Sequence, residues 1–189
     1  MRLLPALFAL AGCAGAVGAL AAEILPPAQA AFATAVEAGR KDWDAAHNDW
    51  QRDDARERRK TALCKLIGDG HVEGWLARVI EARPEGNRAA YLAVHLDGSE
   101  DIELETINLE ETDARYHTLI REGTPIFSVV RTLGKDDPVT ISGDFIAHGP
   151  KDGWGADSDC LTSTNWNWTT AMHHPTVLFR FTAVAKRAP

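Results

Sequence analysis

The stretch AYLAVHLDGSEDIELETINL, residues 90–109, decides the fold class. Apolar residues recur at every second position in its first half, which is the period of a strand with one buried face. The Asp97-Gly98 pair then predicts a tight turn into a second alternating segment, 102–109. The apolar phase slips by one residue within that second segment, which indicates a β-bulge. The stretch therefore predicts an antiparallel hairpin.

Further strands are expected on both sides of this hairpin, at 72–81, 139–147 and 177–184. Gly143 falls in the middle of one of them, where a glycine indicates close packing or strong curvature. Residues 160–164 are a candidate for one more short strand. Between the third and fourth strands, Thr124 as N-cap and Pro125 at the first helical position predict a helix that ends before Gly134.

The N-terminal part has a different sequence pattern, because its apolar residues follow a helical spacing. The stripe consists of Phe32, Val36, Trp43 and Trp50. Densely mixed acidic and basic residues between these positions are typical of a solvated helix face. One long helix over about 28–66 is expected, with Gly39 as a place where it kinks.

Three consecutive strands, a helix and two more strands is the order of the OB-fold, a small five-stranded barrel. The sequence thus predicts an α+β chain: a long N-terminal helix followed by a five-stranded OB-like β-barrel with a helix between strands 3 and 4. The expected division is a leader at 1–22, a helical arm at 23–70 and the barrel domain at 71–189. A generic α+β domain is the alternative.

Several short motifs occur in an order known from a group of bacterial proteins. They are Asn48-Asp49-Trp50-Gln51 followed by Arg56, Arg58 and Arg59; Trp75 to Val79; Leu119 to Pro125; Ile141 to Phe145; and Leu161-Thr162 with Pro175 to Thr182. In this order the chain resembles bacterial secreted proteins that carry an OB-like (tRNA-anticodon-binding-like) barrel domain. The resemblance covers about residues 42–184, implies the fold and brings no catalytic activity. An insert with Trp166 and Trp168 departs from the pattern, which has a shorter glycine-containing turn there.

The first 22 residues, MRLLPALFALAGCAGAVGALAA, have the layout of a secretory signal peptide. One positive charge precedes an apolar run that ends in the A-x-A pattern of Ala19 to Ala21. A membrane anchor is one alternative. Lipidation of Cys13 is another, because Leu10 to Cys13 resembles a lipobox. We expect a periplasmic or secreted protein with no membrane span once the leader is removed.

The number of cysteines agrees with a periplasmic or secreted location. Without the leader the chain keeps Cys64 and Cys160. An even cysteine count in an oxidising compartment predicts a disulfide between them. Two buried free thiols are the alternative.

The acidic net charge of the chain argues against binding to nucleic acid. The formal net charge is −7, and residues 97–113 hold eight acidic residues and no Lys or Arg. This segment covers part of the usual OB ligand face, so a phosphate backbone would be repelled there. The alternative function is nevertheless a single-stranded nucleic-acid-binding OB domain, in which Trp75 and Tyr91 would stack on bases.

No enzyme or cofactor is predicted. The G-x-S-x-G pattern of a nucleophile elbow is absent from the sequence. His173 and His174 are adjacent, and the acidic residues of the loop 149–159 do not have calcium-loop spacing. We expect no cofactor and no metal.

The run Asn165-Trp166-Asn167-Trp168 is the feature that points to a function. Two exposed tryptophans with polar neighbours suit a protein, peptide or glycan contact. In the alternative interpretation, one ring packs over the barrel mouth and the other packs on the N-terminal helix. The sequence predicts a non-enzymatic binding or accessory module for an envelope protein or peptide, with Trp154, Trp166 and Trp168 as its contact surface.

Overall fold

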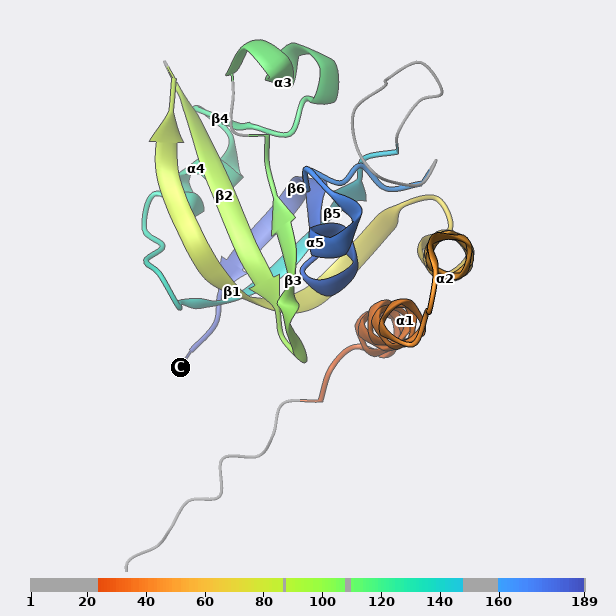
Figure 1. The fold of residues 1–189 in the computed structure, drawn as a ribbon. Coiled ribbons are helices and arrows are strands. Elements are labelled where there is room, and N and C mark those ends of the chain that lie inside the picture. The colour runs from red at the N-terminus through yellow and green to blue at the C-terminus, as the bar shows by residue number, and fades with distance from the viewer. Residues whose placement is uncertain (1–23, 87, 108–109, 148–159, 189) are drawn as a thin grey trace, which may run out of the picture.

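The computed structural model describes residues 24–86, 88–107, 110–147 and 160–188 (Figure 1). In chain order the elements are α1 (Pro27–Asp44), α2 (Asp49–Ile67), β1 (His71–Glu85), β2 (Ala89–Leu96), β3 (Ser99–Glu105), α3 (Glu110–Tyr116), β4 (Ile120–Arg121), α4 (Pro125–Val130), β5 (Pro138–Phe145), α5 (Trp168–His173) and β6 (Thr176–Lys186). Residues 1–23, with Cys13, and the segment 148–159, with Trp154, lie outside the described residues.

The strands form one mixed sheet of six strands in the order β1-β5-β6-β3-β2-β4. β3 and β6 run parallel, and the other pairings are antiparallel. β1 also pairs with β2, so the pairings lead back to the first strand. The long, curved β1 makes both of its pairings through register shifts, one beside Val72 and one beside Val79. The α+β class is confirmed, whereas the count of five strands is wrong because β4 is an additional short strand.

The single N-terminal helix predicted from the apolar stripe is wrong. The chain forms two helices, α1 and α2, which lie side by side (Figure 1). Asn48 caps the start of α2, because its side chain accepts a hydrogen bond from the backbone N–H of Gln51 (3.0 Å). The Gln51 side chain in turn accepts from the N–H of His47 (2.7 Å). These side chains satisfy the N–H groups of a new helix start in the middle of the apolar stripe.

The helix pair shares its core with the sheet. Phe32 of α1 packs within 5.4 Å of the Trp75 ring centroid and 5.3 Å of that of Phe145. The buried Gln29 side chain donates to the carbonyl oxygens of Leu76 (2.7 Å) and Asp97 and accepts from the N–H of Leu76 (2.7 Å). These bonds fix α1 to β1.

Gly39 is a contact point between the helices and not a kink. A Cβ atom there would lie 2.5 Å from Cδ and 2.7 Å from Cβ of Arg59 on α2. Arg59 is buried, and its Nη1 donates to the carbonyl oxygens of Ala171 (3.0 Å) and Met172 (3.3 Å) in α5. Gly39 therefore makes room for the side chain that joins the helix pair to α5.

Two local predictions within the sheet region also need correction. The phase slip after Glu105 marks the end of β3 and not a bulge, since Ile107 instead donates its N–H to the Thr118 hydroxyl (2.8 Å). Residues 160–164 form a single bridge, Ser163 to Val177, in place of a strand. The helix predicted from Thr124 is confirmed as α4, with Thr124 as its N-cap.

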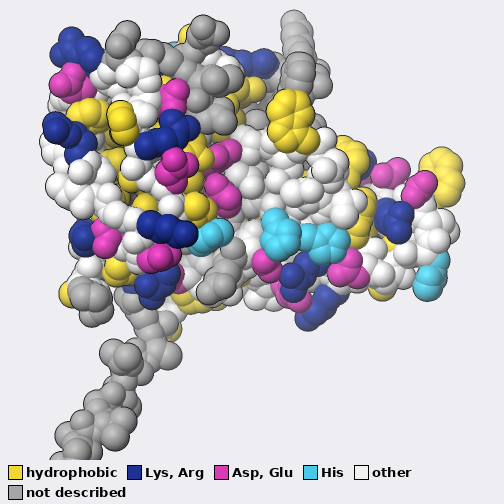
Figure 2. Space-filling model, turned by 60° about the vertical axis from the view of Figure 1, so that its left-hand side comes forward, with side chains coloured by type: hydrophobic (Ala, Val, Ile, Leu, Met, Phe, Trp, Pro, Cys, Tyr) yellow, Lys and Arg dark blue, Asp and Glu magenta, His cyan; other side chains and the backbone are white. Residues whose placement is uncertain are grey.

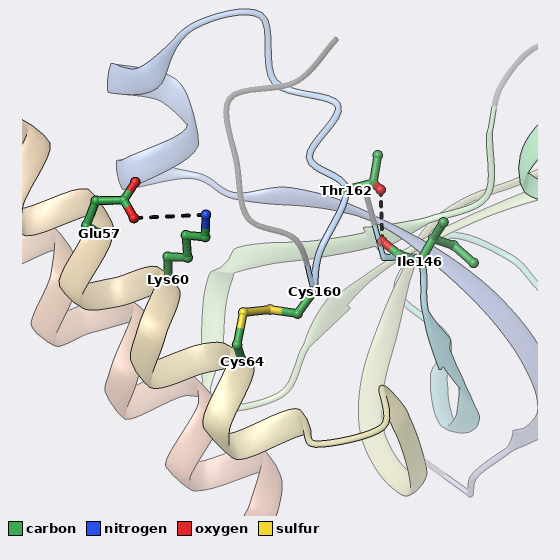
Figure 3. The surroundings of a disulfide bond; sticks show 6 residues. All are labelled: Glu57, Lys60, Cys64, Ile146, Cys160 and Thr162. Atoms are coloured by element: carbon green, nitrogen blue, oxygen red, sulfur yellow. Dashed lines mark hydrogen bonds and ion pairs between the residues drawn. A yellow bond between two sulfur atoms is a disulfide. The ribbon is translucent and has the colours of Figure 1, made fainter. Parts of the chain in front are cut away.

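The predicted disulfide is confirmed, because the sulfur atoms of Cys64 and Cys160 lie at bonding distance, 1.95 Å, with a Cα–Cα distance of 5.5 Å (Figure 3). It joins the end of α2 to the segment before α5. Thr162 fastens the same segment to the sheet by donating its hydroxyl to the carbonyl oxygen of Ile146 (2.8 Å) (Figure 3). In the part of the chain that the structure describes, none of the helices is long and apolar enough to cross a membrane.

Candidate functional site

The segment that carries Trp166 and Trp168 is held by its asparagines. Asn165 accepts from the N–H of Thr176 (2.9 Å) and donates to the carbonyl oxygen of His174 (3.2 Å). Asn167 is the N-cap of α5, since its side chain accepts from the N–H of Thr170 (2.9 Å). The asparagines of this run are therefore structural, and they fix the backbone on both sides of Trp166.

The two tryptophans have different surroundings. Trp168 begins α5 and is half-buried, and the guanidinium carbon of Arg56 lies 4.1 Å from its ring centroid. Trp166 is 89% exposed. We call Trp166, Trp168 and Arg56 the tryptophan surface. Trp168 thus packs against Arg56 of α2, as the alternative interpretation expects of one ring, whereas Trp166 is strongly exposed.

The tryptophan surface is chemically suited to contact another molecule. An exposed indole has a large apolar area and an N–H donor, a combination enriched at interfaces. A guanidinium over an indole is attracted to the ring face and keeps Trp168 in place. Since the backbone around Trp166 is also fixed, little backbone entropy would be lost when a partner covers this ring.

Trp75 and Tyr91 do not lie on this surface. Trp75 is 2% exposed and belongs to the aromatic core under α1. Tyr91 is 6% exposed; its hydroxyl lies 2.5 Å from a carboxylate oxygen of Glu105, and the Arg83 guanidinium lies over its ring at 4.3 Å. Because both rings are almost fully buried, neither presents an open face on which a ligand could stack in this structure.

The outer face around Tyr91 is acidic. Glu81, Glu103 and Glu105 lie together here, and burial, followed by the charges of Glu105 and Glu81, raises the pKa of Glu103 to about 7. Burial, and then its bond to Glu105, also raises the pKa of Tyr91. Figure 2 shows acidic and basic side chains interspersed over the side of the molecule that carries β1 and β2, with no continuous basic area in view. Such a face does not attract a phosphate backbone.

An internal cavity and possible metal-ligand clusters are the other features of the described chain that bear on chemistry. A cavity between the helix pair and the sheet, lined by Phe32, Val36 and Leu63 among others, measures about 20 Å³, which is room for about one water molecule. Within residues 24–86, 88–107, 110–147 and 160–188, no three His, Cys, Asp or Glu side chains are grouped to hold a metal ion.

Two parts of the surface were missed by sequence reasoning. Arg56 stands among alternating charges, and nothing in that pattern marks one arginine as the partner of a tryptophan 112 positions away. Trp50 is 83% exposed at the start of α2, although its spacing placed it in the buried stripe. The Asn48-x-x-Gln51 pattern, read as a helix start, would have separated Trp50 from that stripe.

The comparisons with known proteins add no relative to this description: no family model, no curated protein and no solved structure matches the chain.

Proposed function

We propose that the protein is a non-enzymatic binding or accessory module that holds an envelope protein or peptide through the tryptophan surface. The observation that carries this proposal is the 89% exposure of Trp166 on a backbone that side-chain hydrogen bonds fix on both sides. Tryptophan and arginine are the residues most enriched among interface hot spots, and here they lie in contact.

The proposal includes the finer description of the fold, an OB-like barrel. Apart from β4, the strand pairings run β1-β2-β3-β6-β5 and return to β1, with β3 parallel to β6. This order, with α3 and α4 between β3 and β5, supports the OB-like arrangement and the resemblance to bacterial secreted proteins with such a domain.

A periplasmic or secreted location is part of the same proposal. The bonded pair Cys64 and Cys160 supports an oxidising compartment. The signal-peptide pattern of residues 1–22 supports export, and lipidation at Cys13 is the alternative way of reaching the envelope.

Single-stranded nucleic-acid binding is the second candidate, and the strand order favours it. The acidic outer face and the buried Trp75 and Tyr91 count against it. We expect no change in tryptophan fluorescence when a single-stranded oligonucleotide is added at low salt, because the face shown in Figure 2 has no continuous basic area to attract it. Saturable quenching that fades as salt rises would favour nucleic-acid binding instead.

The Trp166→Ala variant tests the proposed surface. Removing this exposed ring should change the free energy of unfolding by less than about 0.5 kcal/mol. Retention of an envelope protein by the immobilised protein should nevertheless fall, by about 2 kcal/mol or roughly 30-fold in affinity, if Trp166 is a hot spot. Urea unfolding measures the stability of the variant. Affinity capture from an envelope extract of the source organism, followed by measurement of the affinity, tests the binding.

Trp50→Ala is the matched control, because Trp50 is also a strongly exposed tryptophan and lies outside the tryptophan surface. It should retain the same protein as the unaltered chain. Equal retention by both variants would contradict the assignment of the surface.

A further inference from the structure

His173, the last residue of α5, has a hydrogen-bond acceptor at each ring nitrogen. Nδ1 lies 2.8 Å from the carbonyl oxygen of Thr169, and Nε2 lies 2.8 Å from Oδ1 of Asp44 at the end of α1. A neutral imidazole has one N–H and can donate to only one of them, whereas the imidazolium donates to both. The bond within α5 and the bond to α1 are therefore donated together only when the ring carries both protons, and the charged ring also attracts the Asp44 carboxylate.

Four elements contribute charged or titratable side chains around the His173–Asp44 bond. α1 contributes Glu37, Arg40 and Asp44, β3 contributes Asp101, α2 contributes Arg59, and α5 ends beside His174. Arg40 is bound to Glu37 (2.5 Å) and to Asp101 (2.9 Å), and His174 Nδ1 lies 3.0 Å from Asp101. Two of the three carboxylates are thus paired with Arg40, whereas Asp44 faces His173 directly.

The balance of these interactions favours the charged ring. The Thr169 carbonyl, and then the Asp44 carboxylate, raise the pKa of His173, while burial and the charge of Arg40 act in the opposite direction. A pKa raised in the folded protein means that protonation stabilises the fold. This stabilisation is complete below the ordinary value of about 6.5 and is lost as the pH rises through the folded-state pKa.

We propose that a proton on His173 holds α5 against α1, so that the tryptophan surface is better ordered in mildly acidic than in alkaline solution. α5 has only six residues, and Trp168 stands at its first position and His173 at its last. A helix this short depends on its tertiary contacts. At the C-terminal end those contacts include the Arg59 bonds to two carbonyl oxygens and the His173–Asp44 bond, and the C-cap residue His174 lies beside Asp101. Arginine keeps its charge near neutral pH, whereas the His173 imidazole changes its charge there. A better ordered tryptophan surface should also bind its partner more strongly at pH 6 than at pH 8, and this extension to partner binding rests on the function proposed above.

The test is an NMR titration of the His173 ring in the whole protein. The midpoint should lie above 6.5, and Asp44→Asn should lower it, because the asparagine keeps an acceptor oxygen but removes the negative charge. Asp44 is half exposed, so this variant should fold. Amide exchange of α5, corrected for intrinsic rates, should be severalfold faster at pH 8.5 than at pH 6 in the unaltered protein.

His71 provides the matched control. Its ring also lies between two carboxylates, those of Asp144 (2.7 Å) and Glu73 (3.4 Å), but it is on β1. His71→Gln should leave the His173 midpoint unchanged. A His173 midpoint at or below 6.5, or one that Asp44→Asn does not lower, would overturn the inference.

Partner capture at pH 6 and pH 8 then separates this inference from the proposed function. Stronger capture at pH 6, lost in Asp44→Asn, supports both. Absence of capture at either pH contradicts the proposed function and leaves the NMR result to decide the role of His173. Equal capture at both pH values, with a midpoint above 6.5, overturns the extension to binding.

Discussion

Replacing Cys64 and Cys160 together by serine should lower the free energy of unfolding by about 4 kcal/mol and the Tm by about 10 °C. The bond joins residues 96 positions apart, so its loss frees a long loop in the unfolded chain. In the folded chain it fixes the end of α2 to the segment that leads to α5. The tryptophan surface spans these two parts, so its fluorescence should change as well.

Urea unfolding of the oxidised protein, of the protein reduced with dithiothreitol and of the double-serine variant measures this effect. Reduction should destabilise the unaltered protein as much as the substitutions do, and it should not change the variant further. A loss below about 1 kcal/mol would contradict the structural role of the disulfide.

Gly143→Val should destabilise the protein by about 3 kcal/mol. A Cβ atom at Gly143 would lie 2.1 Å from the backbone oxygen of Arg180 and 2.5 Å from the Phe179 ring. Moving either neighbour would cost considerable energy, since one is backbone of the paired strand and the other belongs to the aromatic core. The register of β5 against β6 also shifts between Ser142 and Gly143.

Thr140→Val in the same strand is the control. Thr140 lies on the half-buried face of β5, so replacing its hydroxyl by a methyl group should change stability by less than about 0.5 kcal/mol. Chemical denaturation of both variants provides the comparison. If Gly143→Val were no more destabilising than Thr140→Val, the close approach of the two strands would be refuted.

Gly143 also shows what sequence can predict about this fold. Glycine inside a strand pattern predicted a close approach, and the structure confirms it. Alternation found the main strands, and the Thr124-Pro125 pair found the start of α4. These signals are local, because they reflect strand pleating, helix capping and backbone freedom within a few residues.

Two elements that sequence reasoning missed, β4 and α5, depend on contacts between distant residues. β4 has two residues, and it exists because Ala89 and Ala90 pair with Arg121 and Ile120. α5 is short and is held by Arg59 and Asp44, which precede it by more than a hundred positions. No local pattern specifies such partners, so an asparagine-capped helix could not be separated from a loop.

The candidate site shows the same difference between local signals, which the sequence contains, and long-range contacts, which it does not reveal. The sequence singled out Trp166 and Trp168 as unusual, but could not assign one to the surface and the other to Arg56. The sequence also indicated Trp75 as a ligand contact. Alternation along a strand shows which residues share a face, but it does not show whether another element covers that face. The neighbours of Trp75, including Phe32 on α1, come from other elements and decide its position.

Site-specific photo-cross-linking at position 166 tests the central claim most directly. A photoreactive phenylalanine analogue replaces Trp166 in one variant and Trp50 in another, and both proteins are irradiated in an envelope extract of the source organism. The tryptophan surface predicts a discrete protein or peptide adduct from position 166 that is absent from position 50. Adducts of equal pattern from both positions, or none from position 166, would contradict it.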